Sequence, residues 1–376
     1  MQLVAYGAQD IYLTGNPQIT FFKVVYRRHT NFAMEAIQQT LSGTISAGTA
    51  TKTTATISRN GDLVHKMYFE HNATAALAAD DDDNFGYRIL DVVDLEIGGQ
   101  LIDRHYGHWL ETWAELTEPN PTGSFTANGA NMGTAELTKF QKMSCAGGVD
   151  TTAFAAPGII YIPLQFWFCR NPGLALPLIA LQYHEIKVSV TTTTAINTGN
   201  LDLWVDYIYL DTDERRRFAQ VSHEYLIEQV QYVLTSAKNT IDLNFNHPVK
   251  ELVWTGTWGT TNVSGAFYTV LTSGATYQLK INGQERFAAR DRDYFTRTQV
   301  WQHHTGFGGV TVKDSIAVYS FALKPEEHQP SGTCNFSRID NAQLVSTGTA
   351  QTLHIYAVNY NVLRIMSGMA GLAYSN

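Results

Sequence analysis

The sequence predicts an all-β chain that folds as two consecutive antiparallel sandwiches or jelly rolls. Short extended runs with period-two alternation recur along the chain, separated by turns such as Arg59-Asn60-Gly61-Asp62. The length of 376 residues exceeds what one hydrophobic core usually serves, so two domains are expected. Motifs of the first half also return in the second half, which indicates a duplicated unit.

The two predicted domains meet at a charged stretch near the middle of the chain. Residues 201–210 alternate as a strand, six of the seven residues Asp211 to Arg217 are charged, and residues 225–233 alternate again. We expect an exposed or partly paired ionic connector that fixes how one domain sits on the other, with Arg215, Arg216 and Arg217 as its basic residues. The expected organisation is an N-terminal arm at 1–20, a first domain at 21–212, a linker at 213–222 and a second domain at 223–376.

The repeat is clearest at two tight turns. Ile97-Gly98-Gly99-Gln100 recurs as Ile281-Asn282-Gly283-Gln284, and each copy follows a predicted strand. A glycine in both copies supplies the backbone freedom that such a turn requires. The stretches FWFCRNPGLALPLIALQYHEIKVSV and LDLWVDYIYL are similarly echoed by VYSFALKPEEHQPSGTCNFSRIDNAQLV and LHIYAVNYNVLRI.

The first 20 residues are predicted to be an arm that lies on a partner surface. Gly7, Gly15 and Pro17 deny this segment a regular element of its own, yet it carries apolar groups that are costly to leave in water. The residues expected to make the contact are Tyr6, Ile11, Tyr12 and Leu13.

Four further stretches have a predicted role in the first domain. TFFKVVYRRHTNF, from Thr20, is expected to be a strand that enters the domain with Arg27 and Arg28 in solvent, a reading favoured over a nucleic-acid contact. The run Asp80 to Asp83 reads as a loop tip, and residues 118–158 read as a long surface excursion. Residues 161–190 are the most apolar stretch and are expected at the centre of the core, with Cys169 as a buried small hydrophobe.

Composition excludes several classes of protein. Charged residues make up 16% of the chain against about 25% in ordinary soluble proteins, which favours large neutral surfaces suited to subunit contacts. The net charge of −8 argues against direct neutralisation of nucleic-acid phosphates. Three scattered cysteines predict neither a disulfide framework nor a zinc site, and no signal peptide or bilayer-spanning run is expected.

No enzyme or cofactor motif stands out. The glycine clusters lack the spacing of nucleotide-binding loops, and neither His184-Glu185 nor His223-Glu224 has a second histidine four residues on. His303-His304 is expected at a loop or strand end on the surface. Weak glycosylation triplets begin at Asn72, Asn262 and Asn335. We therefore expect no catalytic residues, no metal and no cofactor.

Several long motifs together resemble the major capsid proteins of nucleocytoplasmic large DNA viruses, nearest to the phycodnavirus type. They include GAQDIYLTGNPQITFFKVVYRRHTNF, LEIGGQLIDRHY, NPGLALPLIALQYHE, WVDYIYLDTDERRRFAQ, FALKPEEHQPSGTCNFSRIDNA and NYNVLRIMSGMAGLAYSN. The resemblance covers both ends of the chain, the central connector and most of the predicted strands. Residues 75–85, 118–158 and 258–277 depart from it and look like the loops that crown the capsomer.

The resemblance implies a structural protein without catalysis. It implies two consecutive eight-stranded antiparallel jelly rolls, and three chains that form a pseudo-hexagonal capsomer in an icosahedral shell. Expected partners are neighbouring capsomers and minor capsid proteins on the inner face. An internal membrane is expected nearby, without insertion, and no direct nucleic-acid contact. The expected location is the virion, with assembly in the host cytoplasm, and the resemblance does not separate the principal capsid protein from a variant one.

Two other classes would also fit an all-β chain. A carbohydrate-binding jelly-roll module would bind glycans without assembling, and a β-sandwich glycosidase would need two carboxylates facing each other across a sugar ring. Nothing in the sequence selects such a pair of carboxylates.

Overall fold

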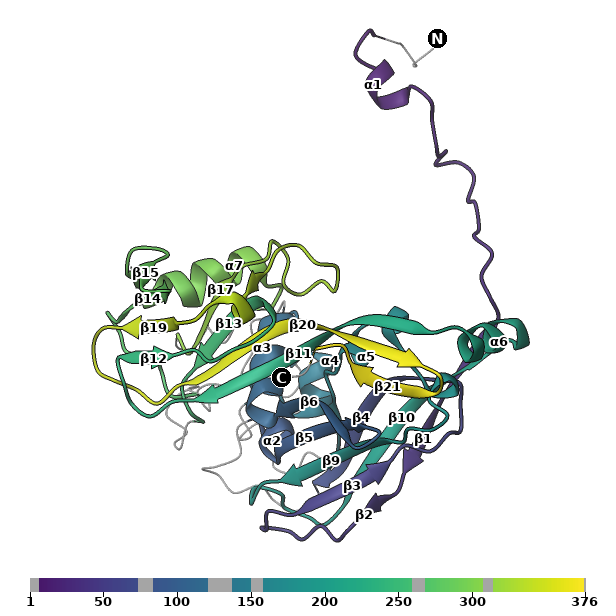
Figure 1. Ribbon diagram of the computed structural model, residues 1–376, viewed down its shortest axis with the longest axis horizontal. Coiled ribbons are helices and arrows are strands. Elements are labelled where there is room, and N and C mark those ends of the chain that lie inside the picture. The colour runs from purple at the N-terminus through teal and green to yellow at the C-terminus, as the bar shows by residue number, and fades with distance from the viewer. Residues whose placement is uncertain are drawn as a thin grey trace.

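The computed structural model describes residues 7–73, 84–120, 137–149, 158–258, 268–306 and 314–374. The body of the molecule is built from four β-sheets, and the N-terminal segment leaves it as a long extended chain (Figure 1). The run Asp80 to Asp83 lies outside the described residues.

Two antiparallel sheets form the first jelly roll. One has the order β1-β10-β4-β7, with β8 also paired to β4, and the other has the order β2-β3-β9-β5-β6. The strands are β1 (Phe32–Gln39), β2 (Leu41–Ser42), β3 (Lys52–Thr56), β4 (Leu63–Ala73), β5 (Leu90–Ile97), β6 (Gln100–Tyr106), β7 (Gly158–Pro163), β8 (Leu176–Pro177), β9 (Ile186–Thr192) and β10 (Leu201–Leu210).

The second jelly roll repeats this plan. Its sheets have the orders β11-β20-β13-β17, with β18 and β21 at the margins, and β12-β19-β14-β15, with β16 beside β14. The strands are β11 (His223–Leu234), β12 (Thr240–Asp242), β13 (Pro248–Thr255), β14 (Thr276–Ile281), β15 (Gln284–Glu285), β16 (Arg290–Asp291), β17 (Ile316–Ser320), β18 (Cys334–Asn335), β19 (Ala342–Ser346), β20 (His354–Met366) and β21 (Met369–Leu372).

The two strand orders correspond position by position when eight principal strands are counted in each unit. In both units the first strand pairs with the eighth, the eighth with the third and the third with the sixth, while the second, seventh, fourth and fifth form the other sheet. The repeated turn lies at the same place in each unit, between β5 and β6 and between β14 and β15. The prediction of two duplicated eight-stranded jelly rolls is therefore confirmed.

The backbone explains the residues of this repeated turn. Gly98 and Gly99 both have positive φ angles, of 60° and 80°. Asn282 and Gly283 occupy the equivalent positions with φ angles of 52° and 75°. Glycine and asparagine tolerate this left-handed region, which two-residue hairpin turns require.

The helices are short. They are α1 (Ile11–Thr14), α2 (Phe85–Arg88), α3 (Gly107–Thr117), α4 (Lys139–Ser144), α5 (Trp167–Arg170), α6 (Thr212–Gln220) and α7 (Gln299–His303), with a π-helical turn at Tyr294–Thr298 and 3-10 turns at Pro172–Leu174, Leu178–Ala180 and Phe336–Arg338. The longest described helix, α3, has 11 residues, so the expected absence of long helices holds for the described part of the chain. No described helix is long and apolar enough to cross a membrane.

The hydrophobic core continues across the seam between the jelly rolls. Trp109 and Trp113 of α3 pack in one cluster with Val253 and Tyr356 of the second jelly roll. Ile227 and Leu363 of the second unit, in turn, belong to the core of the first. The two jelly rolls therefore share buried surface, and a flexible linker is not their only connection.

Two expectations about the first half are wrong. Residues 21–31 form no strand and stay exposed, so the extended arm continues to β1. Part of the supposed surface excursion is buried, because α4 packs beside β7 and Glu111 accepts hydrogen bonds from the backbone N–H groups of Gly147 and Gly148. The most apolar stretch does lie in the core, with Cys169 buried as expected.

Candidate functional site

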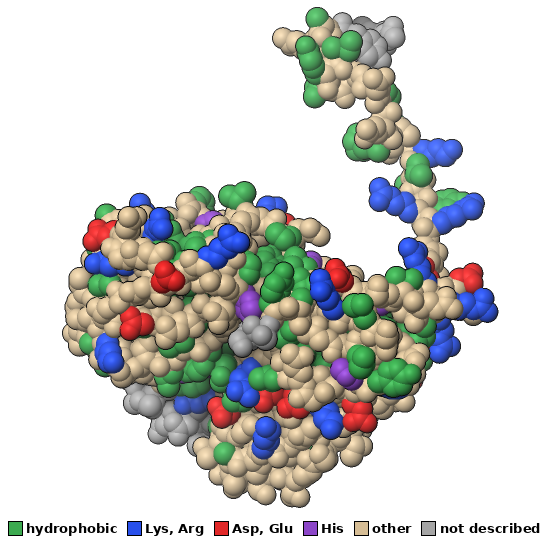
Figure 2. Space-filling view, in the orientation of Figure 1, with side chains coloured by type: hydrophobic (Ala, Val, Ile, Leu, Met, Phe, Trp, Pro, Cys, Tyr) green, Lys and Arg blue, Asp and Glu red, His purple; other side chains and the backbone are tan. Residues whose placement is uncertain are grey.

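The N-terminal arm is the most exposed apolar segment of the described chain. Ile11, Tyr12 and Leu13 are 68%, 89% and 85% exposed, and they lie on the single turn of α1. Figure 2 shows green apolar side chains and blue basic ones along the arm, well away from the body. Tyr6 lies outside the described residues. The expectation that the arm has no regular element is wrong at α1, although that helix has only four residues.

The charged connector is a helix. Asp211 caps α6 by accepting a hydrogen bond from the N–H of Thr212, and Asp213 and Glu214 in the first turn favour the positive end of the helix. Arg215, Arg216 and Arg217 are all exposed. The guanidinium of Arg215 contacts Asp62 of the first jelly roll, with 2.9 Å between Nε and Oδ1.

A second ionic cluster, which the sequence did not reveal, crosses the seam itself. Glu228 of β11 lies 3.0 Å from Arg170 Nη1 of the first jelly roll and 2.8 Å from Lys250 Nζ of β13. Arg170 also stacks over the ring of Trp113, 4.6 Å from its centroid. Burial opposes the charge on Glu228, but Arg170, His328 and Lys250 together outweigh it and lower the pKa of Glu228 to about 2.

One sequence signal could have found this cluster. Lys250 lies inside the buried, mostly apolar strand Pro248–Thr255, and the residue that follows it, Glu251, is also charged and buried. A charge that is buried in a strand needs a partner, and the sequence does not say which of the 34 acidic residues supplies it.

The expectation that His304 lies on the surface is wrong. Its ring is fully buried and bridges two carboxylates, with Nε2 2.9 Å from Glu251 Oε2 and Nδ1 3.0 Å from Glu326 Oε1. Burial disfavours the charged ring, but Glu251 and Glu326 outweigh it and raise the pKa of His304 to about 9. Through these two ion pairs, the imidazolium links the end of α7 to β13 and to the loop after β17.

Helix α3 buries two carboxyl groups one turn apart. Burial raises the pKa of Glu111 to about 7, and the amides of Gly147 and Gly148 partly oppose that rise. Burial and the neighbouring Glu111 raise the pKa of Glu115 well above its usual range. Both carboxyl groups therefore favour the protonated form more strongly than an exposed glutamate does.

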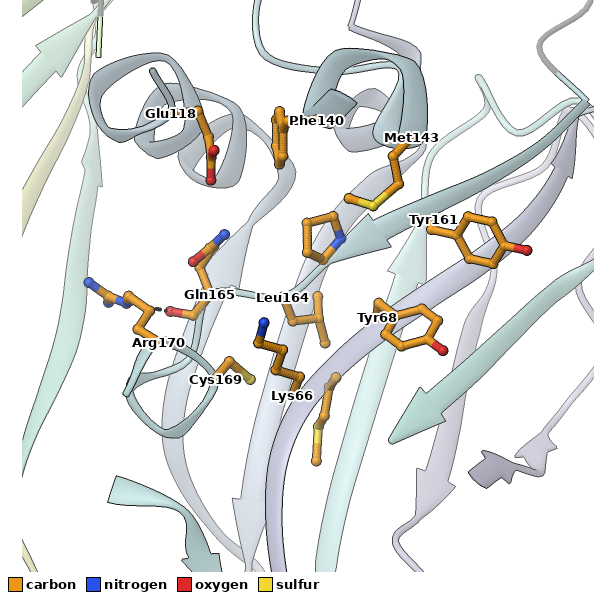
Figure 3. Close-up of a pocket in the computed structure, with 12 residues that line it drawn as sticks. Lys66, Tyr68, Glu118, Phe140, Met143, Tyr161, Leu164, Gln165, Cys169 and Arg170 are labelled. Atoms are coloured by element: carbon orange, nitrogen blue, oxygen red, sulfur yellow. Dashed lines mark hydrogen bonds between the residues drawn. The ribbon is translucent and has the colours of Figure 1, made fainter. Parts of the chain in front are cut away.

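A surface pocket of about 500 Å³ lies beside β4 and β7 (Figure 3). Aromatic and apolar side chains line it together with Lys66, Glu118 and Arg170, and the Tyr68 and Tyr161 rings meet edge to face at 6.0 Å. Burial raises the pKa of Cys169 to about 12, so this thiol is protonated at neutral pH and is no nucleophile. Arg170 Nε donates to the Gln165 carbonyl, which orients the side chain toward the seam.

The remaining predicted residues do not gather into a site. Asn335 is exposed, and its side chain accepts a hydrogen bond from Ser337 N–H. Asn72 is half-buried within β4, and Asn262 lies outside the described residues. No group of three metal-ligating side chains occurs among the described residues. The exposed apolar arm is therefore the candidate functional site among the described residues.

Comparison with known proteins agrees with this architecture. Residues 20–211 match the family model described as major capsid protein N-terminus, and residues 214–371 match that of the large eukaryotic DNA virus major capsid protein. The chain is 51% identical to the major capsid protein of Pyramimonas orientalis virus and 42% identical to that of Paramecium bursaria Chlorella virus 1. Each match covers 100% of this chain and 99% of the relative.

Solved structures agree as well. The crystal structure of PBCV-1 VP54 matches with a TM-score of 0.78 at 36% identity, over 95% of this chain and 100% of that one. The Faustovirus major capsid protein, at 14% identity, shares the fold with a TM-score of 0.67 over 96% of this chain and 94% of its own. Two jelly rolls of one topology and two family matches that together span nearly the whole sequence lead to one conclusion: the chain belongs to the major capsid proteins of large eukaryotic DNA viruses and is a component of the virion shell.

Proposed function

We propose that three copies of this chain form a pseudo-hexagonal capsomer that tiles an icosahedral shell. The observation that carries the proposal is the position-by-position equivalence of the two jelly rolls. Three copies of a chain with two similar units place six similar units around a threefold axis, and this arrangement approximates a hexagon. Closed cyclic symmetry is the usual arrangement of identical subunits.

The shared core of the two jelly rolls supports this role. Because α3 and β20 bury side chains on both sides of the seam, each chain contributes a rigid pair of units to the ring. A flexible linker would let the two jelly rolls rotate relative to each other, and the six units of the ring would then no longer be evenly arranged. The low content of charged residues, 16%, also suits wide contacts between subunits and between capsomers.

The arm suits a contact on the inner face. We propose that residues 1–20 bind minor capsid proteins there, close to an internal membrane but not inserted in it, and that the shell assembles in the host cytoplasm. A large apolar surface that is exposed in one chain needs a partner in the assembly. In this proposal the protein is no enzyme and does not contact nucleic acid directly.

Light scattering of the purified protein tests the trimer. We expect a mass near three times the 41.8 kDa of one chain at micromolar concentration, because obligate interfaces of this kind bury more than about 2,000 Å². A monomer at that concentration would contradict the proposed capsomer. A glycan array adds a second readout, since a lectin of this fold would bind sugars as a monomer.

A further inference from the structure

Strand β1 presents an unprotected edge. Among the described residues it pairs with β10 alone, and of its eight side chains only Gln39 is buried. Phe32 and Met34 are 52% and 49% exposed, and Glu35 is the only charged residue of the strand. Exposed edges are normally short or protected by lysine, proline or a covering segment. Strand β1 is eight residues long, contains no lysine or proline and has no second strand paired to it in the described part of the chain, so the edge is suited to receive another strand.

The arm carries the segment that fits this edge. Residues 19–26, ITFFKVVY, are β-branched or aromatic except for Lys23, a composition typical of a strand, yet they form none in this structure. All of the apolar side chains among them are more than 70% exposed, up to 97% for Phe22. Residues 19–26 therefore have the composition of the strand that the sequence predicts, but no strand is paired with them in this structure.

One antiparallel register matches the two segments residue for residue. It places Lys23 opposite Glu35, the large Phe22 opposite Ala36, and Val24 opposite Met34. Opposite charges and apolar pairs that face each other across an antiparallel ladder stabilise it. The eight residues 19–26 then cover all eight residues of β1.

We propose that residues 19–26 of one copy add as a strand to the β1 edge of a neighbouring copy. The arm leads away from its own β1 and makes no hairpin with it (Figure 1). The arm, residues 1–31, carries three basic residues and one acidic residue, a charge of +2, so the rest of the chain carries −8 − 2 = −10 and opposite charge favours contact of the arm with the body of another copy.

This inference rests on the proposed trimer and adds a contact to it. In a ring, each copy gives one arm and receives one, so every β1 strand gains a second pairing partner. The chain from residue 26 to residue 32, the start of β1, reaches at most about 20 Å. The pairing segment lies about 5 Å from the β1 strand that receives it. The exchange therefore requires the N-terminal ends of neighbouring β1 strands to lie within about 25 Å of each other.

A disulfide assay tests the exchange. A chain with Val24→Cys is mixed with a chain with Met34→Cys, both carrying Cys334→Ser because the native Cys334 is only partly buried. Facing residues of an antiparallel pair are close enough for a disulfide. After unfolding, reassembly and mild oxidation, we expect a covalent dimer that contains one chain of each kind. Ile11→Cys with Met34→Cys is the matched control and should not crosslink, because Ile11 lies outside the register.

A charge exchange tests the register. Lys23→Glu or Glu35→Lys alone should speed trimer dissociation by about two- to fivefold, and the double variant should restore the original rate. Arg28→Glu changes the same charge outside the paired segment and should have a smaller effect.

Each outcome decides one claim. An intrachain disulfide in a chain that carries both Val24→Cys and Met34→Cys would show a hairpin within one copy and would overturn the exchange. A trimer by light scattering that gives no crosslink would overturn the exchange and leave the capsomer standing. A chain that stays monomeric would remove the capsomer and the exchange together.

Discussion

The ionic cluster at the seam gives the sharpest prediction about stability. Glu228→Gln keeps the shape of the side chain and removes the charge that Lys250 and Arg170 share. Lys250 is 1% exposed, and burial lowers its pKa, so its ammonium depends on the carboxylate for compensation. Removal of one partner of a buried pair costs about 3 to 5 kcal/mol.

The pKa shift of Glu228 gives a similar magnitude for this stabilisation. The folded pKa of Glu228 is about 2 against 4.5 for the free side chain, a difference equivalent to roughly 3 kcal/mol. Because the folded pKa is depressed, this stabilisation is present above about pH 4.5 and is lost as the pH falls through about 2. Desolvation acts on both partners, because burial opposes the charge on Glu228 and also lowers the pKa of Lys250.

Thermal unfolding at neutral pH measures the effect. An unfolding entropy of about 2.1 cal/mol/K per residue converts 3 to 5 kcal/mol into a fall in Tm of about 4 to 6 °C for a chain of 376 residues. Glu224→Gln is the matched control, since Glu224 lies on the same strand, is 61% exposed and pairs with the exposed Arg364. Its Tm should fall by about 1 °C or less. Equal shifts in Tm for the two variants would refute the view that the seam cluster is a buried, stabilising one.

Three further predictions concern the arm, the connector and pH. Removal of Met1 to Thr20 should leave a folded trimer with nearly unchanged melting, since six of the eight pairing residues remain, but should impair incorporation into virions; loss of the trimer, or normal incorporation, would contradict the assigned role. Arg216→Ala should change the free energy of unfolding by no more than about 1 kcal/mol, because the residue is exposed, and a loss as large as that of a core truncation would contradict an exposed connector. The folded pKa of His304, about 9, lies above 6.5, so its stabilisation is complete below about pH 6.5 and disappears as the pH rises through 9. The folded pKa of Glu111, about 7, is raised above 4.5, so stability also falls as the pH rises through 7, and a Tm that increased from pH 6 to pH 9 would contradict both effects.

The fold could be predicted because its signals are local. Period-two alternation in residues 201–210 and the repeated turn at Gly98-Gly99 each depend on neighbouring residues, and both have the expected structure. The duplication was visible for the same reason, since equivalent turns need equivalent residues.

The contacts between distant segments could not be predicted in the same way. The burial of His304 depends on Glu251, 53 residues away in sequence, and the seam pair joins Arg170 to Glu228 across 58 residues. A histidine or an arginine has the same local pattern whether its partner is water or a buried carboxylate. Residues 19–26 have the local pattern of a strand but form none, because local sequence does not specify whether a partner strand is available.

Electron microscopy of the purified, assembled protein tests the central claim most directly. We expect a particle with threefold symmetry and six similar lobes, two from each chain, together with a trimeric mass. A particle with twofold symmetry, or a single two-lobed chain at micromolar concentration, would contradict it.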